Sequence, residues 1–173
     1  MIAVVRVPSE PSRHRVAVWR ELRRGGAIAL AAGTWALPST PLTAETVNKV
    51  RDLIARAPDG ELVLLDARGR DDVSEARLRQ QYTVAREAEW IEFLSDSAKF
   101  HAEIEREIAK EKFTLAELEE EEQSLDRLRR WHRELSLRDT FGAQSAGEAS
   151  VALKESTERL EGYAERVYRA LGH

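Results

Sequence analysis

The second half of the chain lacks the two residues that most strongly interrupt helices. No proline follows Pro58, and no glycine lies between Asp71 and Phe141. Proline removes a backbone donor and glycine carries a large entropic cost in a helix, so this composition is typical of long helices. It predicts helices over residues 74–112, from the capping box Thr114-Leu-Ala-Glu117 onward, and over residues 149–171. Two long helices and a short one in series predict an antiparallel bundle or a coiled-coil hairpin.

The first part of the chain has a different texture, in which short β-branched segments alternate with two helical patterns. The predicted strands are residues 2–7, 27–30, 34–37 and 61–66, and the predicted helices are residues 13–24 and 43–57. This β-α-β-β-α-β order is that of a ferredoxin-like sheet domain. The last strand contains Leu62-Val63-Leu64-Leu65, apolar on both faces, which predicts a central place in the sheet. The predicted fold class is therefore α+β, a ferredoxin-like βαββαβ sheet domain followed by a long-helix hairpin or bundle.

Composition and charge change together near Asp72. We predict a sheet domain over residues 1–72, a helical hairpin over 73–143, and a linker with a C-terminal helix over 144–173. Residues 1–72 hold 11 basic and 9 acidic side chains, a net charge of +2, whereas residues 73–173 hold 16 and 22, a net charge of −6. The mildly basic front and acidic back suggest a charged partner for one part of the chain.

Several classes of function are excluded or disfavoured by missing residues. The chain has no cysteine, which excludes disulfides, iron–sulfur clusters and thiol nucleophiles. The apolar run before Arg6 is too short for a signal peptide, and nothing approaches the roughly 20 apolar residues of a membrane span. We therefore expect a cytoplasmic protein without membrane contact.

No pattern of metal-binding or catalytic residues is complete. The four histidines are His14, His101, His132 and His173, and none belongs to a Glu-x-x-His pair or a zinc helix motif. His101 and Glu105 have ligand spacing, but one such pair on an acidic helix is usually solvated. Ser145 lies in a stretch of small residues that predicts a flexible link, because the spacing of the glycines is wrong for a nucleophile elbow. We expect no enzyme activity, no metal and no cofactor.

The first predicted helix has an apolar and a basic face. On a helical wheel, Val18, Trp19 and Leu22 share one face. Four arginines, called the arginine stripe below, gather on another: Arg13, Arg20, Arg23 and Arg24. Two further basic residues lie off the stripe near the helix start: His14 and Arg15. Guanidinium groups in a row suit phosphates or other oxyanions, so nucleic acid, chromate or sulfate are candidate ligands; a solvated surface face is the alternative.

The large apolar side chains predict packing. Trp19 and Trp35 lie in predicted packed elements, so we expect both in the core and not in base stacking. Four aromatic residues along the long helices predict a helix–helix or dimer seam: Trp90, Phe93, Phe100 and Trp131. A stripe of leucines with Trp131 on the helix after Thr114 supports a second hypothesis, a homodimer or other protein-interaction module.

Particular motifs resemble the N-terminal domain of the chromate-resistance regulators called ChrB. They are Pro8-Ser-Glu-Pro-Ser-Arg13, Trp19-Arg-Glu-Leu22 and Gly33-Thr-Trp-Ala-Leu-Pro38, with the expected gaps between them. The similarity continues in Arg86-Glu-Ala-Glu-Trp90, Leu128-Arg-Arg-Trp131, Asp139-Thr-Phe-Gly-Ala143 and Arg166-Val-Tyr168, so it covers nearly the whole chain.

This resemblance implies a role in chromate resistance, with transcriptional control of a chromate-efflux operon and operator DNA as partner. It also implies a ferredoxin-like front related to the phenylacetate-pathway repressors and to the CRISPR-associated adaptation endonuclease subunits. Active endonucleases of that kind carry a metal-binding aspartate at the end of the first strand, where this chain reads Val5-Arg6-Val7-Pro8, so nuclease chemistry is not expected. Full-length family members have a further C-terminal domain, often assigned to chromate sensing, so direct chromate sensing is not expected of residues 1–173.

Overall fold

The computed structural model describes residues 1–172; His173 lies outside the described residues. The chain divides into two compact units. The sheet unit comprises Met1–Ala85 with Arg138–Phe141, and the helical unit comprises Arg86–Leu137 with the residues from Gly142 onward. The predicted division at residue 72 follows the change in secondary structure, whereas these units follow packing, so the first part of one long helix belongs to the sheet unit.

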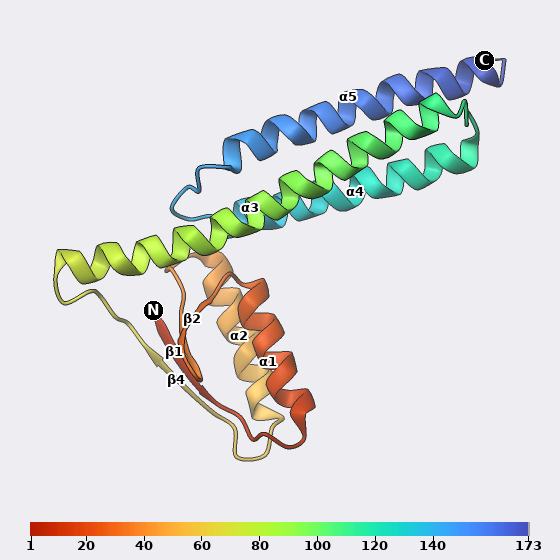
Figure 1. Cartoon of the computed structure of the whole chain (residues 1–173). Coiled ribbons are helices and arrows are strands. Elements are labelled where there is room, and N and C mark those ends of the chain that lie inside the picture. Colours follow the sequence, from red (N-terminus) through yellow and green to blue (C-terminus); the bar gives the residue numbers. More distant parts are fainter. Residues whose placement is uncertain (173) are drawn as a thin grey trace. The chain divides into compact units, whose positions relative to one another are not determined.

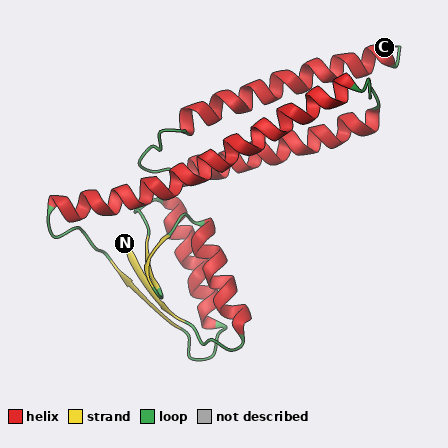
Figure 2. Ribbon diagram, viewed as in Figure 1, coloured by secondary structure: helices red, strands yellow, loops and turns green. Residues whose placement is uncertain are grey.

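The sheet unit has the predicted order of elements (Figures 1 and 2). They are β1 (Ile2–Arg6), α1 (Ser12–Arg24), β2 (Ile28–Ala31), β3 (Thr34–Ala36), α2 (Pro41–Ala55) and β4 (Glu61–Leu65). The helix α2 begins where Pro41 occupies the first turn and the Thr40 hydroxyl accepts a hydrogen bond from the Thr43 amide at 3.2 Å. No side chain caps α1, whose cap residue is Pro11.

The four strands form an antiparallel sheet in the order β2-β3-β1-β4. The prediction that β4 is central was wrong, because β4 is an edge strand. Its sequence is apolar on both faces, but Val63 and Leu65 remain 50% exposed on one of them. A strand that is apolar on both faces therefore does not have to be covered on both faces.

The helices α1 and α2 cover one face of the sheet and close its main core. Val18 and Leu22 of α1 and Val50 and Ile54 of α2 pack against a common set of side chains, which includes Ala3, Trp35 and Leu37. A smaller cluster forms around Ile28, Ala36 and Tyr82, the last of which comes from the first part of the helix after β4. The Tyr82 hydroxyl donates to the Arg138 carbonyl at 2.9 Å, which ties the segment Arg138–Phe141 to this unit.

Close packing of α1 on α2 depends on Gly25, at the end of α1. A Cβ atom at this position would lie 2.1 Å from Oγ1 of Thr46, and Thr46 is itself buried. Its φ of −76° is open to any residue, so steric contact and not backbone strain requires glycine here.

We expect Gly25→Ala to lower the free energy of unfolding by about 1–3 kcal/mol, because overpacking forces the two helices apart. Chemical denaturation followed by circular dichroism measures this. Gly162→Ala is the matched control, since a Cβ there meets nothing within 4 Å and alanine is the better helix former; it should stabilise the protein by up to about 1 kcal/mol. An unchanged stability of Gly25→Ala would show that the helices separate without cost.

Three long helices pack together in the helical unit, namely α3 (Asp72–Ala109) from Arg86 onward, α4 (Leu115–Arg138) and α5 (Ala146–Ala170). The predicted capping box is confirmed in part, because the Thr114 hydroxyl accepts a hydrogen bond from the Glu117 amide at 3.3 Å. None of the helices within residues 1–172 is long and apolar enough to cross a membrane.

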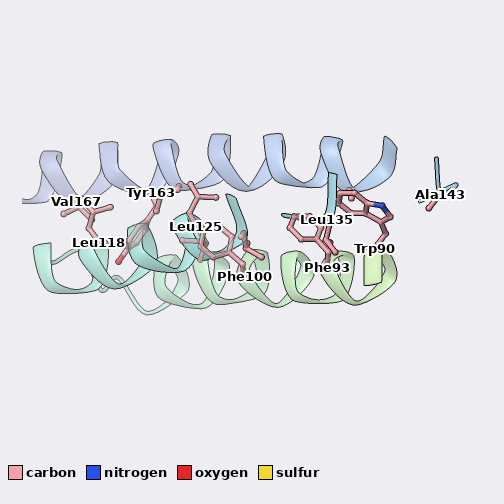
Figure 3. Packing of buried hydrophobic residues seen from close by; sticks show 13 residues of the cluster. Trp90, Phe93, Phe100, Leu118, Leu125, Leu135, Ala143, Tyr163 and Val167 are labelled. Atoms are coloured by element: carbon pink, nitrogen blue, oxygen red, sulfur yellow. The ribbon is translucent and has the colours of Figure 1, made fainter. Parts of the chain in front are cut away.

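All three helices contribute to one core (Figure 3). Trp90, Phe93 and Leu135 pack together near one end of it, and Leu118, Tyr163 and Val167 pack near the other. The predicted helix–helix role of the aromatic residues is thus confirmed. Most leucines of the stripe proposed as a dimer seam are buried in this core, namely Leu118, Leu125, Leu128 and Leu135, whereas Leu115 is 51% exposed.

Candidate nucleic-acid interface

The six residues predicted to bind an anion all lie on α1, which presents most of them to solvent. Because Val18 and Leu22 anchor one face of the helix in the core, the opposite face must point outward. Five guanidinium groups, called the α1 arginines below, lie on exposed residues: Arg13, Arg15, Arg20, Arg23 and Arg24. His14 is half-buried, and its Nε2 accepts a long hydrogen bond of 3.4 Å from Nε of Arg13.

The α1 arginines are not neutralised by neighbouring acids. Within residues 1–172, none of the five forms an ion pair with a carboxylate. The one acid of α1, Glu21, lies 3.8 Å from Nζ of Lys49 on α2, and Lys49 also donates to Glu45 at 2.5 Å. This second contact raises the pKa of Lys49 and lowers that of Glu45. These two acids are thus held mainly by a lysine of α2; Arg24 adds to the lowering of the pKa of Glu45 but forms no ion pair with it.

Several arginines of the helical unit form ion pairs with carboxylates. Arg129 pairs with Asp126 at 3.3 Å, and Arg159 pairs with Glu105 at 2.7 Å across two helices. These contacts are exposed and contribute little stability, but they compensate charge locally. What distinguishes α1 is that five exposed arginines without an ion pair lie within thirteen residues of one helix.

Trp19 corrects one prediction from the sequence. Its side chain was expected in the core with Val18 and Leu22, but it is 51% exposed, whereas Trp35 is 8% exposed as predicted. Trp19 therefore lies at the border of the apolar face of α1. The Arg23 guanidinium carbon lies 5.9 Å from the centroid of its ring, a cation–π distance.

A groove of about 370 Å³ runs between α1 and the sheet, beside Trp19. Its walls include the side chains of Val5, Val7 and Trp35. Arg6, Arg15 and Trp19 also line it, and Arg6 is paired with Glu61 at 2.5 Å. Arg15, which the helical wheel places off the arginine stripe, therefore faces a concave surface together with Trp19.

Two further histidines, His101 and His132, make contacts within the helical unit, and His173 lies outside the described residues. Nε2 of His101 lies 2.8 Å from Oγ of Ser156, and Nε2 of His132 lies 3.1 Å from Oγ of Ser150. Burial lowers the pKa of both imidazoles, which favours the neutral form. Among residues 1–172, no group of three or more potential ligands is arranged to hold a metal ion.

The structural role of Glu87 was not predicted from the sequence. Its carboxylate accepts hydrogen bonds from the Ser145 hydroxyl and, at 3.1 Å, from the Ser145 amide, and the hydroxyl contact is the main reason for its lowered pKa. Ser145 immediately precedes α5, so a carboxylate of α3 holds the start of the third helix. The link of small residues is therefore fixed at this point of the helical unit.

Comparison with known proteins agrees with this sequence pattern. The model of the family described as "Protein ChrB, N-terminal" matches residues 15–173. The chain belongs to this ChrB N-terminal family. Protein ChrB of Cupriavidus metallidurans is 33% identical over 99 residues, a match that spans 56% of this chain and 30% of that protein. No solved structure matches the chain.

Membership of the ChrB family bears on α1 directly. The family match begins at Arg15, inside α1, and therefore includes Trp19 and three residues of the arginine stripe: Arg20, Arg23 and Arg24. The ChrB family is associated with chromate resistance, as the motif resemblance implied. The curated ChrB protein is much longer than the matched segment, so the match identifies the domain only. The activity of this chain has to be inferred from the surface of α1.

Proposed function

We propose that this chain is a DNA-binding regulatory module for chromate resistance, that its sheet unit is of the ferredoxin-like class, and that it holds operator DNA through α1. The observation that carries the proposal is the set of five exposed α1 arginines without acidic partners. Guanidinium groups bind phosphate oxygens with two parallel hydrogen bonds, and the release of counterions from DNA drives such contacts.

The local charge of α1 favours DNA binding, whereas the net charge of the whole chain does not. The formal net charge is −4 overall, which disfavours DNA on average. Residues 12–24, however, contain five arginines and one glutamate. Because ionic interactions at the surface are screened over about 8–10 Å in physiological salt, DNA on α1 would experience this local field more strongly than distant acids.

Two features favour binding over catalysis. The end of β1 carries Arg6 and not the aspartate of the related active endonucleases. The α1 surface also offers several guanidinium groups and no adjacent nucleophile and base. Guanidinium groups are sufficient to bind phosphate, whereas hydrolysis would also need the nucleophile and the base.

The salt dependence of DNA binding tests the proposal. Fluorescence anisotropy with a duplex from upstream of the chain's own gene should give an affinity that falls steeply with salt. Replacing Arg13, Arg20 and Arg24 with alanine should reduce the slope of log K against log salt by roughly 3, since each phosphate contact contributes about 0.9.

A matched control separates α1 from net charge. Replacing Arg127, Arg130 and Arg133, exposed residues of α4, with alanine removes the same charge from the helical unit and should leave the slope unchanged. Undetectable or salt-independent binding by the parent chain would refute the proposal, as would equal losses in the two triple variants. Calorimetry with chromate and sulfate covers the other possible ligands of the same arginines; binding of these anions without DNA binding would reassign the surface.

A further inference from the structure

Trp19 is an exposed tryptophan with no packing role that accounts for it. Its side chain is half exposed, while the neighbouring Val18 and Leu22 already anchor α1. A tryptophan has a large apolar side chain, so leaving it exposed to water forgoes a large burial free energy. Indole rings are enriched at surfaces that contact a partner. The position of Trp19 therefore points to a ligand that the indole would cover.

The neighbours of Trp19 define the chemistry of that ligand. Arg15, Trp19 and Arg23 follow each other at intervals of four residues and so form one row along α1. Arg23 lies over the indole ring, and Arg15 lines the groove together with it. The row thus alternates cation, aromatic ring and cation, which matches a chain of alternating phosphates and planar bases.

The groove beside this row is suited to a flat, largely apolar group. Val5, Val7 and Trp35 supply apolar walls, and no carboxylate is among the residues that line it. Gly33, which also lines the groove, has a φ of 71° and lets the β2–β3 turn approach β1, because a Cβ there would lie 2.6 Å from the Val5 carbonyl oxygen. The groove therefore has an apolar interior and a cationic border. No negative charge among its lining residues would repel an anion.

We propose that this groove binds an unpaired nucleobase of a single-stranded segment, with the base stacked on Trp19 and its phosphate held by Arg15. Bases in a duplex are stacked on each other and their faces are not free, so an aromatic platform selects bases outside a duplex. The proposal rests on α1 being a nucleic-acid interface, and it adds a preference for single strands that the arginine stripe alone would not give.

The test compares labelled oligothymidylate with a duplex by fluorescence anisotropy. Trp19→Ala should weaken binding to the single strand about tenfold, because a base–aromatic stack contributes about 1–3 kcal/mol by alanine substitution. Binding to the duplex should change by less than about twofold, because phosphate contacts dominate there. Val16→Ala, at another exposed apolar position of α1, is the matched control and should leave both affinities unchanged.

Tryptophan fluorescence gives a second, direct readout. Trp19 is far more exposed than Trp35 or Trp90, so a base stacked on it should quench the emission of the parent chain as oligothymidylate is added. Trp19→Phe retains an aromatic ring and should bind the single strand within about threefold of the parent, since a smaller ring still stacks, but without that quench.

The outcomes separate this inference from the proposed function. If Trp19→Ala leaves the affinity for single strands unchanged, or if the quench persists in Trp19→Phe, the groove does not hold a base. Should the duplex still bind through Arg13, Arg20 and Arg24 in that case, the proposed function stands without the inference. If the parent chain binds neither form of nucleic acid, both are wrong. Circular dichroism confirms that each variant is folded.

Discussion

Replacing Phe93 with alanine should lower the free energy of unfolding of the helical unit by about 4 kcal/mol. The Phe93 side chain is fully buried. Its ring packs edge to face on Trp90, Trp131 and His132, with centroids 6.0, 5.4 and 5.4 Å away. The variant loses the burial of the ring, leaves a cavity, and also loses aromatic contacts worth about 0.5–1.5 kcal/mol each, terms that overlap within the total.

The measurement is urea denaturation followed by circular dichroism and tryptophan emission. Ile91→Ala, two residues away on the same helix and 55% exposed, should change stability by less than about 0.5 kcal/mol. Phe93→Leu keeps much of the volume and should cost less than half as much as alanine. If Phe93→Ala unfolds at the same urea concentration as Ile91→Ala, the core shown in Figure 3 does not hold the helical unit together.

Glu121 should make the helical unit less stable as the pH rises from about 4.5 to about 7. Glu121 is only 5% exposed, and its burial, together with nearby carboxylates on α3 and α4, raises its pKa from 4.5 to about 7. Those neighbours are Glu103, Glu120, Glu107 and Glu117. In this interval the folded protein keeps a proton that the unfolded chain releases, so the free energy of unfolding falls with pH.

The total change is about 3 kcal/mol, since each unit of pKa corresponds to about 1.4 kcal/mol. Below pH 4.5 both states hold the proton and the stabilisation relative to high pH is complete; above pH 7 it is lost. Glutamine cannot ionise, so Glu121→Gln should be more stable than the parent at pH 8, by an amount of this order, and should gain little at pH 4.5.

The difference between the unfolding curves of the two proteins across this pH range isolates the effect of Glu121. Other groups change stability in the opposite direction: burial lowers the pKa of His101 and His132, so their contribution is lost as the pH falls. Glu122→Gln, at an exposed position next in the chain, is the control and should follow the parent curve. A Glu121→Gln curve parallel to that of the parent would show that Glu121 is ionised in the fold at neutral pH.

Most of the elements could be predicted from the sequence because their limits are chemical. The pair Gly25-Gly26, Pro41 and the Thr114 cap are residue types that favour helix ends, and all three lie at ends in the structure. The position of β4 in the sheet could not be predicted from its composition. Apolar residues on both faces indicate a strand, but they do not determine which strands lie beside it.

The candidate site was predictable in part. The exposed arginines followed from helical periodicity once the buried face was known. Periodicity does not decide the exposure of Trp19, because this residue lies at the border of that face. The burial of Glu121 could have been predicted from its spacing along the helix. Glu121 has the three- and four-residue spacing of Leu118, Leu125 and Leu128, which places this one member of the Glu119–Glu122 run inside the bundle.

The edge position of β4 has a consequence for the behaviour of the protein at high concentration. Within residues 1–172, β4 pairs only with β1, so one row of its backbone donors and acceptors is open, next to the half-exposed Val63 and Leu65. Such an edge can template the addition of a strand from another molecule and so begin aggregation. Glu61 and Arg6, ion-paired at its start, and Asp66 just beyond its end place charges there. Charges in such flanking positions act as gatekeepers against self-association, so these side chains protect solubility more than they stabilise the fold.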